Sequence, residues 1–385
     1  MQTPQISRRA TLHSVGAFLI SMIGASTRGT HADTIPNRGS REVRCKGPFS
    51  GDGRRLLVPH GRVVRMYNVE TGKEEVRIEG HSEPVRAAIF SPDDKLILTG
   101  GGREEDMASR STDNSARLWN AATGREIRQF VGHRSFVHTV QFSPDGHQIL
   151  TAGRDGTARI WKSDSGEQSF VFSGVSYLPP AAVIRPDGTQ LLTLVGERGA
   201  VIWDTNSGQR ICGIQSQPDE SRFQSAEFHP LSALVITASL DRTVRIWDSG
   251  TGKEVLQLIG HTSFVHRASF SSNGEQAISA SADGSIRTWD AKTGKELHRF
   301  ANPGPVNEVI LSADGRRFLA RWHADVNNAR ESGITLWDAD LGLELRRAKD
   351  SWILGFSPDG KHALIASSFT TLWDATSGDL VREFK

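Results

Sequence analysis

The sequence predicts an all-β fold in which one unit of four short antiparallel strands occurs eight times. Two observations support this prediction. In eight places an apolar, β-branched stretch ends in an aromatic residue followed by a polar one, and a glycine follows five positions after the aromatic residue. A turn of the type Phe-Ser-Pro-Asp-Gly precedes most of these stretches. A fixed period of roughly 20 to 50 residues indicates a repeat architecture.

The aromatic residues define the eight units in chain order. They are Tyr67, Trp119, Trp161, Trp203, Trp247, Trp289, Trp337 and Trp373, and they are 36 to 52 residues apart. Asp-Gly between apolar runs predicts a hairpin, because glycine accepts a positive φ without a Cβ clash. In the third unit these signals predict strands at about 138–142, 148–152, 158–161 and 169–172.

Four-stranded sheets of this size cannot bury both apolar faces alone, but eight sheets packed face to face in a ring can. The recurring tryptophan supplies apolar surface for the contact between neighbouring sheets. The hairpin turns within each unit argue against a parallel solenoid. We therefore expect an eight-bladed β-propeller at 43–385, with four strands per blade, closed by packing of unit 1 against unit 8.

Charge and cysteine content exclude some classes of protein. The net charge is +2, and three of the positive charges lie in the first 32 residues, which contain no Asp or Glu. The rest of the chain is thus close to neutral, which does not indicate a nucleic-acid-binding surface. Cys45 and Cys212 lie in different units, so we expect no disulfide between them.

The first 32 residues read as a signal peptide. Arg8 and Arg9 precede a short apolar stretch at 15–25, and Thr30-His31-Ala32 is a candidate cleavage site. The stretch is too short to span a bilayer, so we expect no stable membrane insertion. The segment at 7–12 resembles a twin-arginine leader. The sequence therefore predicts a linker at 33–42 and a bacterial protein that is periplasmic or secreted.

The period, the Trp-Asp dipeptides and the Gly-His dipeptides at 80–81, 132–133 and 260–261 resemble WD40 repeats. The resemblance implies buried hydrogen-bonded tetrads of His, Ser or Thr, Asp and Trp. They are His81, Thr99, Asp113 and Trp119; His133, Thr151, Asp155 and Trp161; and His261, Ser279, Asp283 and Trp289. It also implies a monomeric, non-catalytic scaffold that binds a protein or peptide partner.

The tetrads could be mistaken for catalytic triads, but a catalytic site normally occurs once and these sets repeat. We find no motif for a metal or other cofactor and expect none. The strongest enzymatic alternative is a quinoprotein dehydrogenase, because Asp290 to Glu296 resembles its docking motif. That motif needs a Trp two residues after the Glu, where this chain has His298 and, in unit 5, Leu256. A carbohydrate-binding propeller is a further alternative.

The candidate partner-binding face is the rim that carries the Gly-His loops. Alignment of three units predicts that a valine points into the core and turns its neighbours outward. Phe136 and Phe264 are expected as exposed aromatics, which are typical interface anchors beside arginine. Arg86, His138 and His266 are expected at the channel mouth, joined by Arg154. Insertions at 101–111 and 321–330 are expected to enlarge the same rim.

Overall fold

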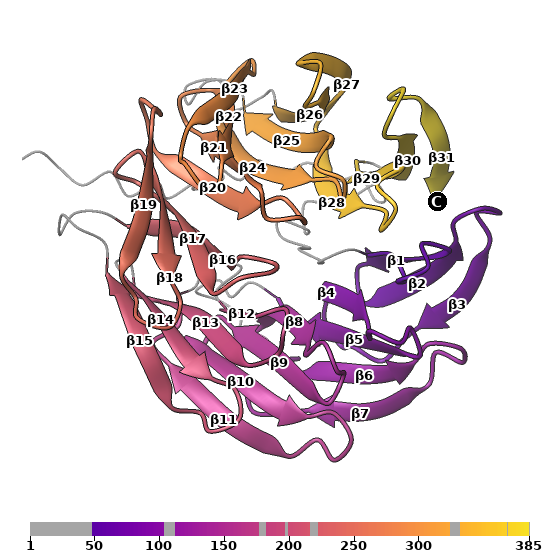
Figure 1. Cartoon of the computed structure of the whole chain (residues 1–385). Coiled ribbons are helices and arrows are strands. Elements are labelled where there is room, and N and C mark those ends of the chain that lie inside the picture. Colours follow the sequence, from indigo (N-terminus) through magenta and orange to yellow (C-terminus); the bar gives the residue numbers. More distant parts are fainter. Residues whose placement is uncertain are drawn as a thin grey trace, which may run out of the picture. The chain divides into compact units, whose positions relative to one another are not determined.

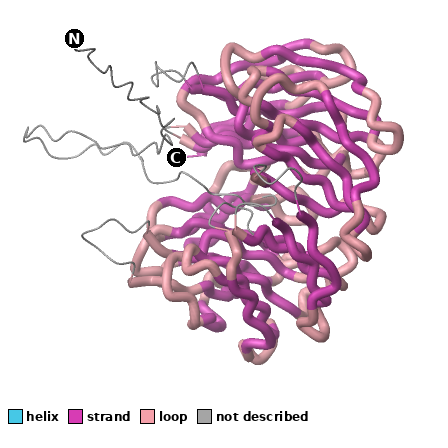
Figure 2. The backbone as a smooth tube through the Cα atoms, turned by 90° about the vertical axis from the view of Figure 1, so that its left-hand side faces the viewer, coloured by secondary structure: helices cyan, strands magenta, loops and turns pink. Residues whose placement is uncertain are grey.

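The computed structural model describes residues 48–103, 112–176, 182–196, 199–215, 222–323, 332–367 and 369–384. The chain divides into two units, Met1–Pro36 and Asn37–Lys385, and all described residues lie in the second. Within that unit eight antiparallel sheets follow one another around a ring (Figure 1). Strands and connecting loops make up the described part of the chain (Figure 2), where no helix is long and apolar enough to cross a membrane.

We number the sheets as blades 1 to 8 in chain order. Blade 1 comprises β1 (Arg55–His60), β2 (Val63–Asn68) and β3 (Glu74–Ile78). Blade 2 comprises β4 (Val85–Phe90), β5 (Leu96–Gly101), β6 (Ala116–Asn120) and β7 (Glu126–Phe130). Blade 3 comprises β8 (Val137–Phe142), β9 (Gln148–Gly153), β10 (Thr157–Lys162) and β11 (Gln168–Ser173). Blade 4 comprises β12 (Ala182–Ile184), β13 (Gln190–Val195), β14 (Gly199–Asp204) and β15 (Arg210–Gln215).

The second half of the ring repeats this order. Blade 5 comprises β16 (Phe223–Phe228), β17 (Leu234–Ser239), β18 (Thr243–Asp248) and β19 (Glu254–Ile259). Blade 6 comprises β20 (Val265–Phe270), β21 (Gln276–Ser281), β22 (Ser285–Asp290) and β23 (Glu296–Ala301). Blade 7 comprises β24 (Val306–Leu311), β25 (Arg317–His323), β26 (Ser332–Asp338) and β27 (Leu343–Lys349). Blade 8 comprises β28 (Trp352–Phe356), β29 (His362–Ala366), β30 (Thr370–Asp374) and β31 (Leu380–Phe384).

The predicted eight-bladed, all-β fold is confirmed, and the four strands of the third unit lie within about one residue of their predicted positions. Blade 1 differs from the prediction, because its described residues form three strands. Where a fourth was expected, Phe49 pairs with Leu56 through an isolated bridge. Blade 7 also differs: the expected insertion begins later, since Arg321 to His323 continue β25 by pairing with β26.

The hairpin turns follow the sequence signals. Gly146 has a φ of 74°, a region that favours glycine. Asp94 occupies the corresponding position in blade 2 with a φ of 59°. Its carboxylate accepts the N–H of Gly51 at 2.9 Å, so this departure from glycine links blade 2 to blade 1.

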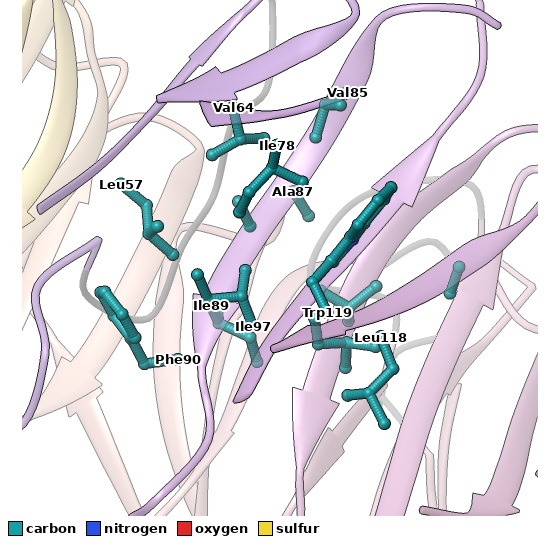
Figure 3. Packing of buried hydrophobic residues seen from close by; sticks show 14 of the residues in the cluster. Leu57, Val64, Ile78, Val85, Ala87, Ile89, Phe90, Ile97, Leu118 and Trp119 are labelled. Carbon is teal, nitrogen blue, oxygen red and sulfur yellow. The ribbon is translucent and has the colours of Figure 1, made fainter. Parts of the chain in front are cut away.

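The core lies between blades rather than inside one sheet. Figure 3 shows the largest cluster, in which Leu57, Val64 and Ile78 of blade 1 pack with residues of blade 2. Trp119 is 1% exposed in the same cluster. Burying a side chain of this size contributes about 2–3 kcal/mol to the free energy of unfolding, which explains the recurrence of an aromatic residue in each unit.

The ring closes between blades 8 and 1 by side-chain packing. One cluster joins Phe49 and Leu56 of blade 1 to Leu354 and Leu364 of blade 8. The rings of Tyr67 and Phe384 lie 5.2 Å apart. Among the described residues no strand is shared between these blades, and β31 completes blade 8 with the chain's own C-terminal segment. The predicted packing of unit 1 against unit 8 is confirmed for the described residues.

Cys212 is a free, half-buried thiol in β15. Its Sγ lies 3.4 Å from the carbonyl oxygen of Ser249 in the next blade. Cys45, the signal peptide at 1–32 and the linker at 33–42 lie outside the described residues.

Candidate functional site

The structure brings the members of each sequence-predicted tetrad together inside blades 2, 3 and 6. In blade 2 the ring nitrogens of His81 lie 2.8 Å from Asp113 Oδ2 and 2.7 Å from Thr99 Oγ1. The indole N–H of Trp119 donates to the same threonine oxygen at 2.8 Å. His133, Thr151, Asp155 and Trp161, and His261, Ser279, Asp283 and Trp289, form the same bonds at 2.8–3.1 Å.

The tetrads stabilise the blades from inside, because each polar group is hydrogen-bonded to another member of the same tetrad. The hydroxyl-bearing residues Thr99, Thr151 and Ser279 are fully buried. Both ring nitrogens of each histidine have protein partners, so no nucleophile-and-base pair faces solvent in these sets. A fully satisfied polar network of this kind fixes strand register.

The tetrad aspartates stay ionised. Burial alone would raise the pKa of Asp113, but hydrogen bonds from His81, Ser115 and the N–H of Ser82 outweigh burial and hold the pKa well below its usual range. Burial is similarly outweighed at Asp155 and Asp283, where the histidine is again the first stabilising partner.

In blades 2, 3, 5 and 6 an arginine pairs with a residue of the outer strand, an acid in blades 2, 5 and 6 and Gln168 in blade 3, and the sequence analysis did not identify this pair. The side chain of the arginine two positions before the tryptophan extends to the outer strand of the same blade. Arg117 bonds Glu126 at 2.8 Å and Arg245 bonds Glu254 at 3.0 Å. The recurrence of arginine two residues before Trp119, Trp161, Trp247 and Trp289 was the signal for this pair.

The remaining blades depart from this pattern in different ways. In blade 5, which lacks a Gly-His dipeptide, Arg245 pairs with Asp241 at 3.0 Å. In blade 7 the position of the tetrad threonine holds Ala320, and the indole N–H of Trp337 is buried without a partner among the described residues. Thr335 accepts the indole N–H of a second tryptophan, Trp322, at 3.0 Å. The guanidinium of Arg321 lies 3.2 Å above the ring centroid of Trp352, at the contact between blades 7 and 8.

We use the term Gly-His rim for the connections from each outer strand to the next blade and from the second to the third strand within a blade. Successive strands are antiparallel, so these connections share one rim. The rim candidates of blades 2 and 3 gather around Phe136. Arg86 and Arg154 place their guanidinium carbons 5.5 and 5.8 Å from the centre of its ring. Arg86 also donates to the carbonyl oxygen of Gly102 at 3.0 Å.

The expectation that Phe136 is an exposed aromatic is wrong, because only 9% of the residue is exposed. The two arginines cover its ring, and Gly102 packs so closely beneath it that a Cβ there would collide with Phe136. Phe264, at the matching position of blade 6, is 48% exposed, as expected.

His138 and His266 occupy β-bulges at the starts of β8 and β20. His138 is buried and lies edge-on to Phe136 at 6.1 Å. His266 is partly buried, and burial lowers its pKa. Arg86 occupies the matching bulge in β4. A β-bulge changes the direction in which its side chain points, which explains why Arg86, His138 and His266 do not point to the inner face of their blades.

A central cavity of about 470 Å³ is lined by the first strands of blades 2 to 8. It includes Glu227, Arg267 and Glu308, and Arg267 pairs with Glu227 at 3.7 Å. It reaches solvent among the Ser-Pro-Asp-Gly turns, where the lining residues Pro186 and Pro358 are exposed. Its lining does not include Arg86, His138, Arg154 or His266. The cavity opens on the opposite rim, so the place of these residues at the channel mouth of the Gly-His rim stays a prediction.

No group of three or more potential metal ligands occurs within the described ranges. The two positions at which the quinoprotein motif needs tryptophan differ in their contact with the turn glycine of the next blade. Leu256 contacts Gly294 in this way, whereas His298 is exposed and Gly342 in the next blade has no neighbour where a Cβ would lie. The tryptophans that lock the ring in that family are therefore replaced in this chain by the smaller Leu256 and the polar His298.

Comparison with known proteins agrees with this geometry. A family model described as WD domain, G-beta repeat matches residues 72–120, 124–162, 211–248 and 252–290. Protein tipD of Dictyostelium discoideum is 32% identical over 102 residues, which are 26% of this chain and 15% of that protein. Human WD repeat and SOCS box-containing protein 1 is 31% identical over 91 residues, 23% of this chain and 20% of its own length. The chain thus spans at most a fifth of either relative.

The C-terminal WD40 domain of Sif2 has a similar structure, with a TM-score of 0.68 and 18% identity over 86% of this chain and 95% of that domain. At this identity the similarity concerns the fold. The matched repeats are those of blades 2, 3, 5 and 6, the four blades in which an aspartate follows the buried threonine or serine. The chain is an eight-bladed β-propeller, and four of its blades are similar to the WD domain, G-beta repeat.

Proposed function

We propose that the protein is a non-catalytic scaffold that binds a protein or peptide partner through the Gly-His rim. The observation that carries this proposal is the arrangement at blades 2 and 3. There Phe136 holds Arg86 and Arg154 against its ring, and Arg154 remains exposed. Arginine on an aromatic support is a frequent contributor to interface energy.

Two further features support the proposal. The tetrad histidines and hydroxyls are hydrogen-bonded to one another, so the side chains that contact a partner are other residues of the rim. WD40 propellers typically serve as protein-interaction scaffolds. Phe264 adds an exposed aromatic to the same rim at blade 6.

The test is a pull-down with the chain from residue 33 onward and two matched variants, with partners identified by mass spectrometry. Arg154→Gln with Phe264→Ser changes the Gly-His rim. Arg54→Gln with Arg125→Gln changes exposed residues of the opposite rim. We expect at least one partner that the wild type and the opposite-rim variant capture and the Gly-His variant loses. Equal capture by all three proteins would exclude the Gly-His rim as the binding face.

We also propose export, on the strength of Arg8, Arg9 and the apolar stretch at 15–25. Arg8→Lys with Arg9→Lys is expected to retain the protein in the cytoplasm if the twin-arginine route is used. Cell fractionation of both forms measures this. Unchanged export of the variant would reject that route and leave general secretion.

A further inference from the structure

The central cavity is a concave site that the proposed scaffold function does not use. Its volume is about 470 Å³, and the first strands of blades 2 to 8 line it. Pockets for small molecules typically have volumes of about 300–1,000 Å³. The cavity opens on the rim opposite to the Gly-His rim, and every turn of that rim lies within the described ranges. The turns that surround its mouth are therefore all placed by the structure.

Hydrogen bonds between neighbouring blades hold the wall of the cavity in shape. The side chain of Gln141 in blade 3 accepts the N–H of Ile184 in blade 4 at 3.1 Å and donates to its carbonyl oxygen at 3.3 Å. Nε2 of His229 in blade 5 donates to the carbonyl oxygen of Gly274 in blade 6 at 3.1 Å, and its ring lies edge-on to Phe270 at 4.7 Å. A wall that is ordered before binding lowers the entropic cost of holding a ligand.

Most of the residues that line the cavity are apolar. Six different blades contribute them; examples in blade order are Val140, Val183, Phe228, Phe270, Leu311 and Leu354. An apolar wall favours a ligand with an apolar body, because both surfaces leave water when they meet.

Several polar side chains of the lining are already hydrogen-bonded within the protein. The hydroxyls of Ser271, Ser312 and Ser357 each donate to the side chain two residues further on, at 2.6–2.7 Å. Thr139 Oγ1 lies 2.9 Å from Nδ1 of His138. These groups stabilise turns and strands, so they contribute little to the choice of a ligand.

The carboxylate of Glu227 differs from these groups. Its side chain is 25% exposed, and no residue that the structure describes donates a hydrogen bond to it. Its ion pair with Arg267 measures 3.7 Å, which is longer than a hydrogen bond. Glu227 precedes Phe228 in β16, and both residues line the cavity. The wall thus combines an apolar surface with a carboxylate that can accept a hydrogen bond from a ligand.

We infer that the central cavity binds a small organic amine. Its apolar body packs against the wall, and its ammonium group donates to Glu227. Hydrogen bonds between charged groups are stronger than neutral ones, and an apolar environment strengthens them further. A ligand carboxylate fits less well, because the described lining carries two carboxylates, Glu227 and Glu308, and one guanidinium, that of Arg267. The inference goes beyond the scaffold function, since the site lies on the other rim.

The test compares three probes that share one apolar body: 3-phenylpropylamine, 3-phenylpropan-1-ol and 3-phenylpropanoate. Isothermal titration calorimetry measures the Kd of each for the full-length protein at pH 7. We expect the amine to bind about tenfold more tightly than the alcohol, because only the amine forms a charge-assisted hydrogen bond with the carboxylate. We expect the carboxylate probe to bind most weakly.

Three variants place the binding at Glu227. Glu227→Gln keeps the size of the side chain but removes its charge, and should weaken binding of the amine about tenfold while changing binding of the alcohol less than about twofold. Glu227→Asp keeps the charge and should retain most of the affinity for the amine. Glu70→Gln is the matched control, because Glu70 is exposed on the same rim and is outside the lining of the cavity. Thermal unfolding shows that each variant is folded.

Four results would overturn the inference. They are equal Kd values for the amine and the alcohol, an unchanged Kd of the amine in Glu227→Gln, no binding of any probe, and tighter binding of the carboxylate probe, which would favour an anion site at Arg267. If Glu227→Gln does not fold, the three probes on the wild type and Glu227→Asp still decide. None of these outcomes affects the pull-down with the Gly-His rim variant, since that variant changes no residue of the cavity.

Discussion

At the scale of single residues, the tetrads place a threonine or serine hydroxyl between an indole N–H and an imidazole. Blade 7 shows how far the arrangement tolerates change. With Ala320 in the hydroxyl position, the indole N–H of Trp337 is buried and has no partner among the described residues, while Thr335 accepts the N–H of a different tryptophan, Trp322. A buried unpaired N–H costs about 1–3 kcal/mol, so the loss of the hydroxyl destabilises blade 7 at this position.

Asp155→Asn tests the charge of one tetrad. The pKa of Asp155 is lowered in the folded protein, so its contribution is complete above the unfolded pKa of about 3.9 and is lost as the pH falls below that value. We expect the variant to lose about 2 kcal/mol of the free energy of unfolding at pH 7. We also expect a shallower decrease toward acid, by up to about 1.4 kcal/mol per pH unit.

Urea denaturation at several pH values between 7 and 3 measures both quantities. Asp379→Asn on the opposite rim is a control, because Asp379 is exposed and its carboxylate makes no hydrogen bond or ion pair among the described residues. A parallel pH profile for wild type and Asp155→Asn would show that the lowered pKa of this group does not contribute to acid sensitivity.

Phe136 and Phe264 occupy matching positions but have different environments. Phe136→Ala should lower the free energy of unfolding by about 3 kcal/mol, because it opens a cavity under two arginines. Phe264→Ala should change it by less than about 0.5 kcal/mol. Chemical denaturation of the two variants compares them directly, and equal losses would contradict the difference in burial.

At the scale of strands and turns, the blades interlock at their outer edges. The glycine of each third-to-fourth-strand turn has a positive φ, and in most blades a side chain of the preceding blade packs against it. Phe170 packs on Gly208 in this way. The junction between blades 6 and 7 lacks the contact, because nothing lies near Gly342 where a Cβ would be.

Gly208 and Gly342 form a matched pair, since both have a φ of 68°. Gly342→Ala should cost only the backbone strain, about 1–2 kcal/mol. Gly208→Ala should cost about 1–3 kcal/mol more, because its Cβ would also collide with Phe170. Thermal unfolding of the two variants separates the cost of backbone strain from the cost of the collision with Phe170. The packing contribution would be excluded if both alanines lowered Tm equally.

At the scale of the whole ring, closure depends on blades that lie at opposite ends of the described chain. Arg382 of blade 8 donates to the carbonyl oxygens of Glu70 and Thr71 in blade 1 at 2.6 and 3.2 Å. Arg128 makes the same kind of contact from blade 2 to blade 3. The closing junction therefore uses the same contacts as a junction between consecutive blades.

Phe384→Ala tests closure, because Phe384 is 4% exposed and packs on Tyr67 of blade 1. We expect a loss of about 3–4 kcal/mol and faster hydrogen exchange in blades 1 and 8 than in blades 4 and 5. Val381→Ala is the control, since Val381 is 47% exposed on the same strand. A loss spread evenly over all blades would indicate that the ring unfolds without opening first at this junction.

The sequence by itself determined the eight blades, the strands of the third unit and the membership of the tetrads. These features depend on local pattern: turn residues set hairpins, and the tetrad residues recur at nearly constant spacing along the chain. Each of them can be found within about 40 residues of chain.

Only the tertiary structure decided which rim side chains reach solvent. Phe136 is covered by Arg86 and Arg154, which are 50 and 18 residues away in sequence, and no local pattern records that contact. The tetrad aspartates are likewise ionised but turned inward by their hydrogen bonds, and the direction of a side chain depends on its folded neighbours rather than on composition.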